Sequence, residues 1–454
     1  MSERFQKFLE SFSGKRVAVL GFGVSNTPLI RLLLRAGAKV TVCDKNSREN
    51  FDAALLDEFS AAEMHLGEDY LDGLDCDVIF RTPGMRPDLP QIQAAVTRGA
   101  LLTSEMEQFF AVCPCPIIGV TGSDGKTTTT TIIYELLKAA GKTCYVGGNI
   151  GTPLLAHAEE MDKSDVAVVE LSSFQLMTMK QSPAVAVITN LAPNHLDVHT
   201  SMDEYIAAKT NLYRHGSGKV VLNLDNEITR GLGETLGDRV RWFSRKEDAH
   251  IALKDRVIYR GETRVLPIDE IRIPGMHNVE NYMAAIAAVE GIVSDEVIRT
   301  VAKEFGGVAH RMELVRTLGG VRYYNDSIAS SPTRTIAGLR AFSQKVVLIA
   351  GGKDKGVPFD DLGPAAMEYC KAVVLNGPTM SRIKTAIESA PGYTPQAVPI
   401  YCCASFEEAV EKAHQIAEEG DIVTLSPACT SFDRFKNFAE RGLYFKKLVG
   451  ELAE

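Results

Sequence analysis

The segment Pro116–Leu137 reads PIIGVTGSDGKTTTTTIIYELL, and the rest of the chain is interpreted from it. Its apolar residues up to Val120 predict a buried strand, and the residues from Lys126 onward have the pattern of a helix. Gly122 and Gly125 lie between the two and free the backbone to curve, so that successive N–H groups can point inward. The segment therefore predicts a strand, a tight glycine loop and a helix.

The start of the predicted helix carries groups that bind phosphate. Lys126 can reach the outer phosphates of a polyphosphate, the Thr127 hydroxyl can hold Mg²⁺, and the positive end of the helix faces the same point. The usual phosphate loop has glycine where this chain has Val120, so a plain strand-to-helix turn is the alternative. That alternative does not explain why lysine and threonine follow the glycine in register. We therefore predict a site for a nucleoside triphosphate.

Length and composition restrict the class of protein. A chain of 454 residues is expected to form about three domains, and 45% apolar with 24% charged residues is typical of a soluble globular protein. The net charge of -9 argues against a nucleic-acid binder and favours small-molecule partners. The nine cysteines form no CxxC pair, and no signal peptide or membrane-length apolar run is present. We expect a cytoplasmic protein with reduced thiols and no membrane insertion.

The first block of the chain has the pattern of a β-α-β unit. The run 16–23, RVAVLGFG, predicts a strand and a glycine turn, and after a helical stretch a second strand is predicted at 39–44, ending in Asp44. Gly21 and Gly23 with Asp44 suggest a dinucleotide fingerprint, but the third glycine is replaced by Asn26. An NAD-dependent oxidoreductase is therefore one alternative, although the same geometry would receive any nucleotide diphosphate.

The central block repeats the pattern of strands whose carboxyl ends carry polar residues. The predicted strands are 142–148, 165–175, 184–197, 219–223 and 240–243. In a parallel sheet these ends meet at one edge, so Lys126, Glu170 and His195 can converge. Glu170 follows four apolar residues, where a carboxylate calls for a cation such as Mg²⁺. His195 could be a metal ligand or a structural histidine. Lys209 on a helical pattern would, from the residues alone, be a solvated lysine.

A third block begins near residue 309, with predicted strands at 321–326, 345–352, 372–376 and 421–426. Segments rich in Gly, Lys, Ser and Thr follow these strands, and such residues at strand carboxyl ends suit an anionic ligand. The fold class is therefore α/β, with three α/β domains at 1–110, 111–308 and 309–454.

Seven motifs in this order resemble the Mur ligases of peptidoglycan synthesis. They are TGSDGKTTT (121–129), ELSSFQL (170–176), NHLDVH (194–199), PGMHNVEN (274–281), HRMELV (310–315), YNDS (324–327) and SPACTSFDRFKNFAERG (426–442). The resemblance implies a Rossmann-like N-terminal domain that binds a UDP substrate, a central P-loop ATP-binding domain and a Rossmann-like C-terminal amino-acid-binding domain. ELSSFQL and the last motif point to the branch that adds D-glutamate.

The resemblance also implies an activity. An ATP-dependent ligase of this branch adds D-glutamate to UDP-N-acetylmuramoyl-L-alanine, in cytoplasmic peptidoglycan precursor synthesis. The substrate carboxylate attacks the γ-phosphate of ATP to give an acyl phosphate and ADP, and the D-glutamate amine then displaces phosphate. Two Mg²⁺ ions and a monomeric chain are expected. The alternatives are another Mur ligase, a folate polyglutamate synthase, which lacks the first domain, and a non-catalytic nucleotide-binding scaffold.

The roles of individual residues follow from the same resemblance. The ATP set is Gly122, Ser123, Asp124, Gly125, Lys126, Thr127, Thr128, Asn278, Asn281, Arg311 and Asp326. The UDP-substrate set is Gly23, Val24, Ser25, Asp44, Lys45, Thr82, Pro83, Gly84, Met85, Asn149 and His195. The D-glutamate set is Ser330, Lys355, Ser431, Phe432 and Phe438. The metal ligands are Thr127, Glu170, His195 and a carbamylated Lys209, and the catalytic residues are Lys126, His195 and Lys209.

Two positions depart from the family pattern. Asp124 stands where asparagine is usual and adds a negative charge near the phosphates. Ile328 stands where a lysine is frequent, so a cation is lost there; Lys353 could compensate, and Ser330 keeps a hydroxyl in the amino-acid pocket.

Overall fold

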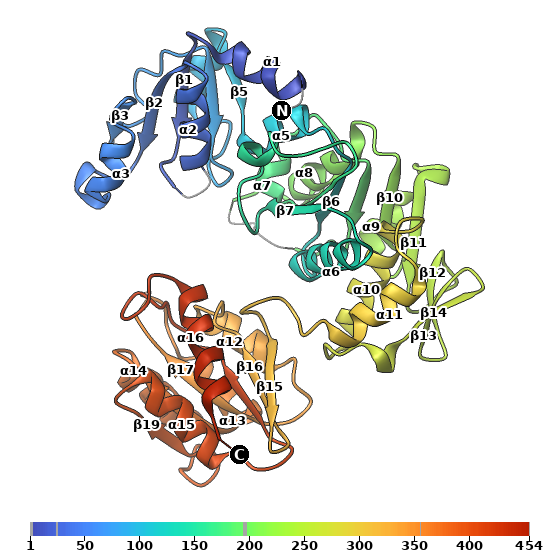
Figure 1. Cartoon of the computed structure of the whole chain (residues 1–454). Helices are drawn as coiled ribbons and strands as arrows, with labels where there is room; N and C mark the ends of the chain where they lie inside the picture. The colour runs from blue at the N-terminus through green and yellow to red at the C-terminus, as the bar shows by residue number, and fades with distance from the viewer. Residues whose placement is uncertain (1–2, 24–25, 194–197, 355, 454) are drawn as a thin grey trace. The chain divides into compact units, whose positions relative to one another are not determined.

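The computed structural model describes residues 3–23, 26–193, 198–354 and 356–453. It contains three sheets flanked by helices, which confirms the predicted α/β class (Figure 1). The chain forms two compact units. Unit 1 holds residues 1–271 and 276–303, with the first two sheets, and unit 2 holds residues 272–275 and 304–454, with the third. Every helix in these described ranges is too short or too polar to cross a membrane.

The first sheet of unit 1 has five parallel strands in the order β3-β2-β1-β4-β5. The strands are β1 (Arg16–Leu20), β2 (Lys39–Asp44), β3 (Glu63–Leu66), β4 (Val78–Arg81) and β5 (Leu101–Thr103). The helices are α1 (Glu3–Phe12), α2 (Thr27–Arg35), η1 (Arg48–Asn50), α3 (Ala53–Glu58), α4 (Pro90–Thr97) and α5 (Glu105–Val112). Because β1, β2 and β4 are adjacent and parallel, the residues after them meet at one edge of the sheet.

The second sheet of unit 1 has nine strands in the order β14-β13-β12-β11-β10-β9-β6-β8-β7. The strands are β6 (Ile117–Thr121), β7 (Cys144–Gly148), β8 (Val166–Glu170), β9 (Val185–Ile188), β10 (Lys219–Asn223), β11 (Val240–Ser244), β12 (Ile251–Lys254), β13 (Val257–Arg260) and β14 (Thr263–Pro267). β6 pairs in parallel with β8 and β9, so the glycine loop after β6 lies between the ends of these two strands.

Helices cover this sheet and carry several site residues. They are α6 (Lys126–Ala139), η2 (Leu155–His157), α7 (Ser173–Leu176), α8 (Met202–Arg214), α9 (Glu227–Gly233), η3 (Gly237–Arg239), η4 (Ile268–Glu270), α10 (Met276–Ala288) and α11 (Asp295–Glu304). α10 packs against α6. Its small buried residues, such as Ala284, Ala285 and Ala287, allow this close approach.

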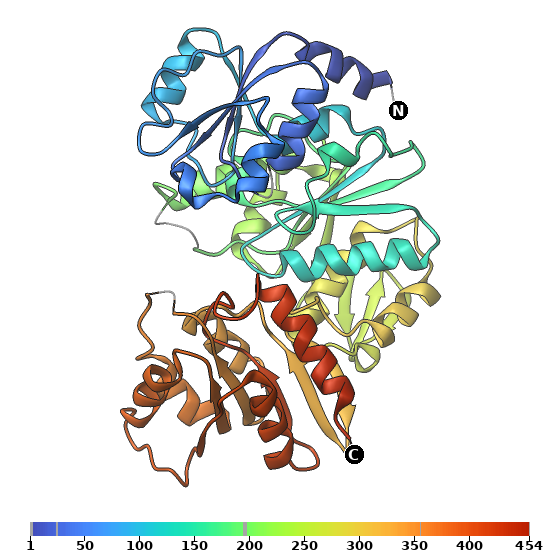
Figure 2. The same cartoon turned by 60° about the vertical axis from the view of Figure 1, so that its left-hand side comes forward.

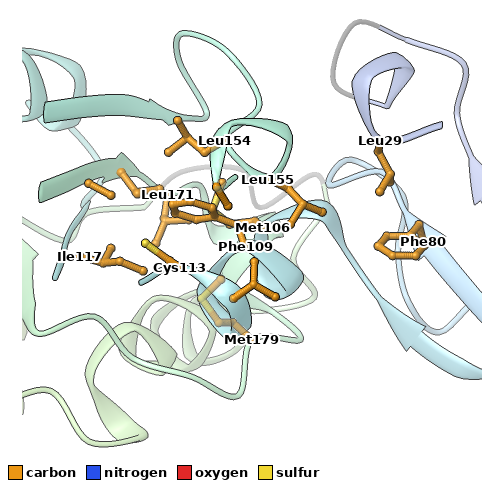
Figure 3. Packing of buried hydrophobic residues seen from close by; sticks show 14 of the residues in the cluster. Leu29, Phe80, Met106, Phe109, Cys113, Ile117, Leu154, Leu155, Leu171 and Met179 are labelled. Atoms are coloured by element: carbon orange, nitrogen blue, oxygen red, sulfur yellow. The ribbon is translucent and has the colours of Figure 1, made fainter. Parts of the chain in front are cut away.

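One continuous hydrophobic cluster joins the two sheets of unit 1 (Figure 3). Phe80 of β4 and Met106 and Phe109 of α5 belong to the same cluster as Ile117 of β6 and Leu155 of η2. Polar contacts reinforce this junction, since the Leu155 backbone N–H donates to the Glu105 carboxylate over 2.7 Å. The first two sheets therefore share a core.

The sheet of unit 2 has the order β15-β16-β20-β17-β18-β19. Its elements are β15 (Glu313–Leu318), β16 (Val321–Asn325), α12 (Pro332–Leu339), β17 (Val346–Gly351), α13 (Leu362–Tyr369), β18 (Cys370–Asn376), α14 (Met380–Glu388), β19 (Ile400–Cys402), α15 (Phe406–Ile416), β20 (Ile422–Leu425) and α16 (Phe438–Glu451). Two hydrophobic clusters cover its faces, one with α12, α13 and α14 and the other with α15 and α16. Figure 2 shows α16 along β15 and β16. The loops after β16, β17 and β20 meet at one edge because these strands are adjacent and parallel.

Candidate active site

The glycine loop after β6 is held in shape by the stretch 189–192. The backbone N–H of Ser123 donates to the Asn190 carbonyl over 2.9 Å, and that of Asp124 to the Asn190 side chain over 3.0 Å. Gly122 has φ +152°, and a Cβ there would overlap the Thr189 hydroxyl, so no other residue fits. The loop is therefore shaped by its own protein contacts, as a phosphate site that needs little reorganisation would be.

The polar side chains of this loop and of the first turn of α6 differ in what they contact. The Lys126 ammonium folds over the loop and donates to the carbonyls of Gly122 and Ser123 at 3.0 and 2.9 Å. Thr127 and Thr128 lie half-buried in the first turn of α6. The Ser123 hydroxyl is already bonded to Ala192 and Tyr205. Asp124 is exposed, so its extra charge faces solvent.

The two asparagines of α10 lie against this loop. The Asn281 side chain accepts from the Thr129 hydroxyl and donates to Asn278, both over 3.1 Å, and both amides are buried. A Cβ at Gly125, whose φ is +78°, would overlap the Asn281 oxygen. The structure thus brings Asn278 and Asn281 to the loop, where they support α6; their contact with a nucleotide stays a prediction.

Glu170 ends β8 with only 1% of its surface exposed. Its Oε1 accepts from the Asn149 amide over 2.6 Å, while its Oε2 is buried and has no hydrogen-bond partner among the described residues. A buried carboxylate oxygen without a donor is unfavourable unless a cation joins it. No group of three acidic, histidine or cysteine side chains is arranged as a metal site in the described ranges, which omit 194–197 and therefore His195.

Lys209 is buried on α8, with 2% exposed, so the expectation of a solvated lysine is wrong. Its Nζ donates to the Thr121 hydroxyl over 3.0 Å and to the Gly122 carbonyl over 2.9 Å, and it lies 4.9 Å from the Tyr205 ring centroid. Burial, with a smaller contribution from nearby Lys126, holds the pKa of Lys209 well below its ordinary value. This lysine can therefore carry a neutral, nucleophilic amine.

Of the predicted UDP-substrate residues, Gly23, Asp44, Lys45 and the loop Thr82–Met85 follow strands of the first sheet, whereas Asn149 follows β7 of the second sheet. The Asp44 carboxylate accepts from the backbone N–H of Phe22 over 2.7 Å and of Asn46 over 2.9 Å, which fixes two turns at this edge. The Asn26 amide donates to the carbonyls of Leu20 and Gly21. Asn26 therefore braces the turn at the place where a dinucleotide fingerprint has its third glycine. Gly23 and Lys45 are exposed, and Val24 and Ser25 lie outside the described residues.

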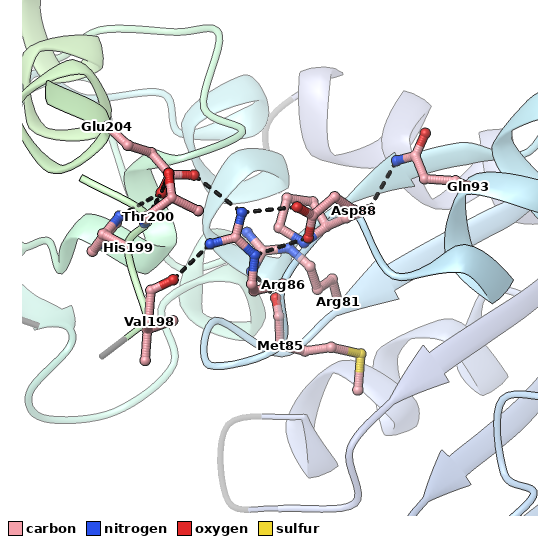
Figure 4. A network of polar contacts seen from close by, with 10 residues as sticks. Arg81, Met85, Arg86, Asp88, Gln93, Val198, His199, Thr200 and Glu204 are labelled. Carbon is pink, nitrogen blue, oxygen red and sulfur yellow. Dashed lines mark hydrogen bonds and ion pairs between the residues drawn. The ribbon is translucent and has the colours of Figure 1, made fainter. Parts of the chain in front are cut away.

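The loop Thr82–Met85 is fixed by a residue that the sequence did not single out. Arg81 is buried, with 2% of its surface exposed. Its guanidinium donates to backbone carbonyls of this loop and to the Phe174 carbonyl on α7, the helix that follows β8 of the second sheet (Figure 4). Burial lowers the pKa of Arg81. Pro83, whose carbonyl accepts one of these hydrogen bonds, is half-buried, and Gly84 is exposed.

In unit 2, Arg311 stands between two residues with left-handed backbone, His310 with φ 63° and Met312 with φ 47°. Such strain needs support from the surroundings. The Asp326 carboxylate supplies it by accepting from the Met312 N–H over 3.3 Å and from the Ser426 hydroxyl over 2.8 Å. Burial raises the pKa of Asp326 to about 7. Asp326 therefore shapes the loop of Arg311, and its contact with ATP stays a prediction.

Of the predicted D-glutamate residues, Ser330, Ser431 and Phe432 lie on loops at the carboxyl edge of the third sheet, and Phe438 begins α16. Ser431 is buried, Ser330 and Ile328 are half-buried, Phe432 is 62% exposed and Phe438 is 38% exposed. Lys355 lies outside the described residues. Lys353 pairs with Thr430 through the backbone.

A buried arginine, Arg441, binds these loops together and was not singled out from the sequence. Its guanidinium donates to Ser327 after β16 and to the carbonyls of Cys429 and Thr430 after β20. Burial lowers its pKa to about 10.

Comparisons with known proteins agree with this geometry. Family models match the chain in three consecutive parts: "Mur ligase MurD-like, N-terminal domain" at residues 15–104, "Mur ligase middle domain" at 120–289 and "Mur ligase, glutamate ligase domain" at 310–429. The chain is 51% identical to UDP-N-acetylmuramoylalanine--D-glutamate ligase of Acetivibrio thermocellus and 49% identical to that of Ruminiclostridium cellulolyticum. Both alignments cover 100% of each chain.

Among solved structures, UDP-N-acetylmuramate-alanine ligase of Thermotoga maritima has the same fold at 18% identity. Its TM-score is 0.58, with 96% of this chain and 99% of that chain covered. From the three matched parts and the full-length relatives, the chain belongs to the Mur ligase family.

Proposed function

We propose that the chain is an ATP-dependent ligase that adds D-glutamate to UDP-N-acetylmuramoyl-L-alanine in peptidoglycan precursor synthesis. The observation that carries this proposal is 51% identity, over the full length of both chains, to a relative named for that reaction. The glycine loop supports it, because a loop fixed by the stretch 189–192, with the Lys126 ammonium over it and the start of α6 beside it, has the features of a triphosphate site.

The reaction requires the protein to bring two anions together, the substrate carboxylate and the triphosphate of ATP. The carboxylate of the UDP substrate attacks the γ-phosphorus of ATP, the bond to the β,γ-bridging oxygen breaks, and ADP leaves. The D-glutamate amine then attacks the acyl carbon, phosphate departs with the C–O electron pair, and the amine loses a proton. Charge neutralisation and alignment dominate both steps. In our proposal Lys126 releases the two loop carbonyls and turns to the phosphates, and Arg311 adds a second cation.

Thr127 and Glu170 are the residues we propose to hold a first Mg²⁺. The unpartnered, buried Oε2 of Glu170 fits such an ion, because the cation would complete a carboxylate that the described protein leaves half satisfied. When bound, Mg²⁺ would neutralise the phosphate oxygens and hold them in line. For a second ion we propose His195 and a carbamylated Lys209.

The environment of Lys209 supports the proposed carbamylation. Its lowered pKa favours the neutral amine, which can attack the carbon of CO₂ to form a C–N bond and release one proton. The product is an anion, and a buried anion next to the glycine loop would require a cation. Mass spectrometry of the intact chain prepared with and without bicarbonate tests this step.

We propose the substrate-binding residues, the domain limits, the oligomeric state and the compartment as well. The UDP-substrate set, the D-glutamate set and the domain limits at 110/111 and 308/309 are kept as given above. We also propose a monomer that acts in the cytoplasm, a compartment in which the nine free cysteines would stay reduced. Light scattering tests the monomer.

The decisive experiment measures phosphate release with UDP-N-acetylmuramoyl-L-alanine, ATP and Mg²⁺. D-glutamate is compared with L-glutamate, L-alanine, L-lysine and diaminopimelate. Release that requires both D-glutamate and the UDP substrate supports the proposal. Release with another amino acid instead would keep the ligase chemistry but refute the D-glutamate assignment, and no release with any of them would refute the activity.

A further inference from the structure

We infer that Arg81 and Arg86 are positioning residues that set the loop Thr82–Met85 against the second sheet and thereby determine affinity for the UDP-linked substrate. This inference rests on the proposed function, since it assigns that loop to the UDP substrate. Neither arginine belongs to the residues predicted from the sequence. Both lie at the junction of the first two sheets, within unit 1 (Figure 4).

Arg81 holds the loop from inside. Its Nη1 donates to three backbone carbonyls in succession, those of Thr82 at 3.3 Å, Pro83 at 2.8 Å and Met85 at 2.7 Å. Three carbonyls aimed at one nitrogen curve the chain around the guanidinium. The conformation of the loop therefore depends directly on this side chain.

The other nitrogen of the same guanidinium crosses to the second sheet. Nη2 of Arg81 donates to the Phe174 carbonyl over 3.0 Å and to the Thr178 hydroxyl over 3.2 Å. Phe174 lies four residues after Glu170, on α7, and its ring stacks on His199 with centroids 5.3 Å apart. One side chain thus links the loop of the first sheet to the segment that follows the proposed metal ligand.

The charge of Arg81 is only partly offset inside the protein, since burial lowers its pKa despite a nearby carboxylate. Glu107 of α5 is a nearby carboxylate that favours the charged guanidinium, and its Oε2 has no hydrogen-bond partner among the described residues. Nε of Arg81 is likewise without a partner in the described part of the chain. A buried charge of this kind is retained at a cost in desolvation, which is understandable where it fixes a functional geometry.

Arg86 forms a second link just beyond the loop. Its Nη1 donates to the Val198 carbonyl over 2.6 Å, and Nη2 bonds Glu204 over 3.1 Å and Asp88 over 2.8 Å. Glu204 also accepts from the Thr200 backbone N–H over 2.6 Å. The segment that leads into α8 is therefore hydrogen-bonded to the residue that follows the loop Thr82–Met85.

Together the two arginines anchor the loop at both ends. Arg81 takes carbonyls from within it and Arg86 follows directly after Met85, so loss of either would allow the loop to shift against the second sheet. A loop that must be put in order when the substrate binds lowers affinity, because part of the binding free energy is used for that ordering. The ATP loop after β6 has its own supports at 189–192 and should keep its affinity.

The test uses Arg81→Lys and Arg86→Gln in the full-length chain. Lysine keeps the charge but has no planar fork, so it cannot serve both the loop carbonyls and α7. Arg316→Lys is a matched control, because Arg316 donates through Nη1 to three carbonyls at the end of α16, those of Val449, Gly450 and Leu452. We measure KM for each substrate, and Kd for the UDP substrate by calorimetry without ATP.

We expect Arg81→Lys and Arg86→Gln each to raise KM and Kd for UDP-N-acetylmuramoyl-L-alanine at least tenfold. KM for ATP should stay within twofold, and Arg316→Lys should change none of these values. A merely structural role would lower the fraction of active protein and the melting temperature without this difference between substrates. If Arg81→Lys shows no cooperative melting transition, the less buried Arg86→Gln decides alone.

The outcomes separate this inference from the proposed function. Folded variants that bind the UDP substrate as tightly as the wild type, or that lose ATP and UDP affinity equally, would overturn the inference while the ligase activity stands. If the wild-type chain binds the UDP substrate but releases no phosphate, the proposed activity fails and the calorimetric comparison still decides the role of the arginines. A wild-type chain that neither binds nor turns over this substrate overturns both.

Discussion

Substitution of Gly125 by alanine should reveal how strongly the glycine loop after β6 depends on its contact with α10. Gly125 has φ +78°, and a Cβ there would overlap the Asn281 oxygen. A left-handed alanine costs about 1–2 kcal/mol. Asn281 would also have to turn away from Thr129 and Asn278, two hydrogen bonds worth about 1 kcal/mol each. The expected loss in free energy of unfolding is therefore about 3–4 kcal/mol.

Gly141 offers a matched control beyond the other end of α6. Its φ is +76° and no atom lies within 4 Å of the point that an added Cβ would occupy, so Gly141→Ala carries the backbone term alone, about 1–2 kcal/mol. The assay is urea denaturation followed by fluorescence of Trp242, the single tryptophan, which lies on β11 in unit 1. Equal losses for Gly125→Ala and Gly141→Ala would refute the contact with Asn281 as a determinant of the loop.

Three further predictions address other sites. Because burial raises the pKa of Asp326 to about 7 from the ordinary 3.8, the folded state binds this proton more tightly than the unfolded chain, so stability should fall as pH rises from about 4 to 7. Asp326→Asn should remove this slope, at most about 1.4 kcal/mol per pH unit, in denaturation followed by circular dichroism at several pH values. Gly442→Ala should destabilise unit 2 by about 1–3 kcal/mol, because its Cβ would overlap His310. Gly450→Ala in the same helix is the control and should be neutral or stabilising by up to about 1 kcal/mol. The denaturation midpoints of the two variants test this difference. Glu170→Gln should weaken Mg²⁺–ADP binding at least tenfold in calorimetry, and an unchanged affinity would contradict the role of Glu170 as a ligand. The same substitution should raise the melting temperature of the metal-free chain, because it removes a buried carboxylate with only one of its oxygens hydrogen-bonded.

The long buried strands could be predicted from the sequence. The predicted strands 39–44 and 219–223 match β2 and β10 residue for residue, because each is an apolar run next to a clear turn. The strands β12, β13 and β14 were among those missed. Each has four or five residues and mixes buried positions with half-buried or exposed ones, so no periodicity stands out.

A site residue could be predicted where a charged side chain stands in an apolar stretch of sequence. It could not be predicted where its burial depends on segments far away in the sequence. Glu170 could be recognised because a carboxylate ends an apolar strand. Lys209 could not, since a helical pattern does not say which face is covered, and the structure places it behind the glycine loop. Arg81 was hidden for the same reason, because its partners Phe174 and Thr178 lie more than ninety residues away.

The shared core of the first two sheets limits how this chain can be recombined with its relatives. Met106 and Phe109 of α5 are buried in one cluster with residues of η2, and Arg35 pairs with Glu159 across the same junction. A chimera joined at 110/111 would divide α5 and set its exchanged residues, Met106 and Phe109 among them, against the native η2, so that a packed surface is mismatched. A workable exchange of the N-terminal residues 1–110 would have to carry residues 154–161 along with them, so the smallest interchangeable part of the gene is discontinuous.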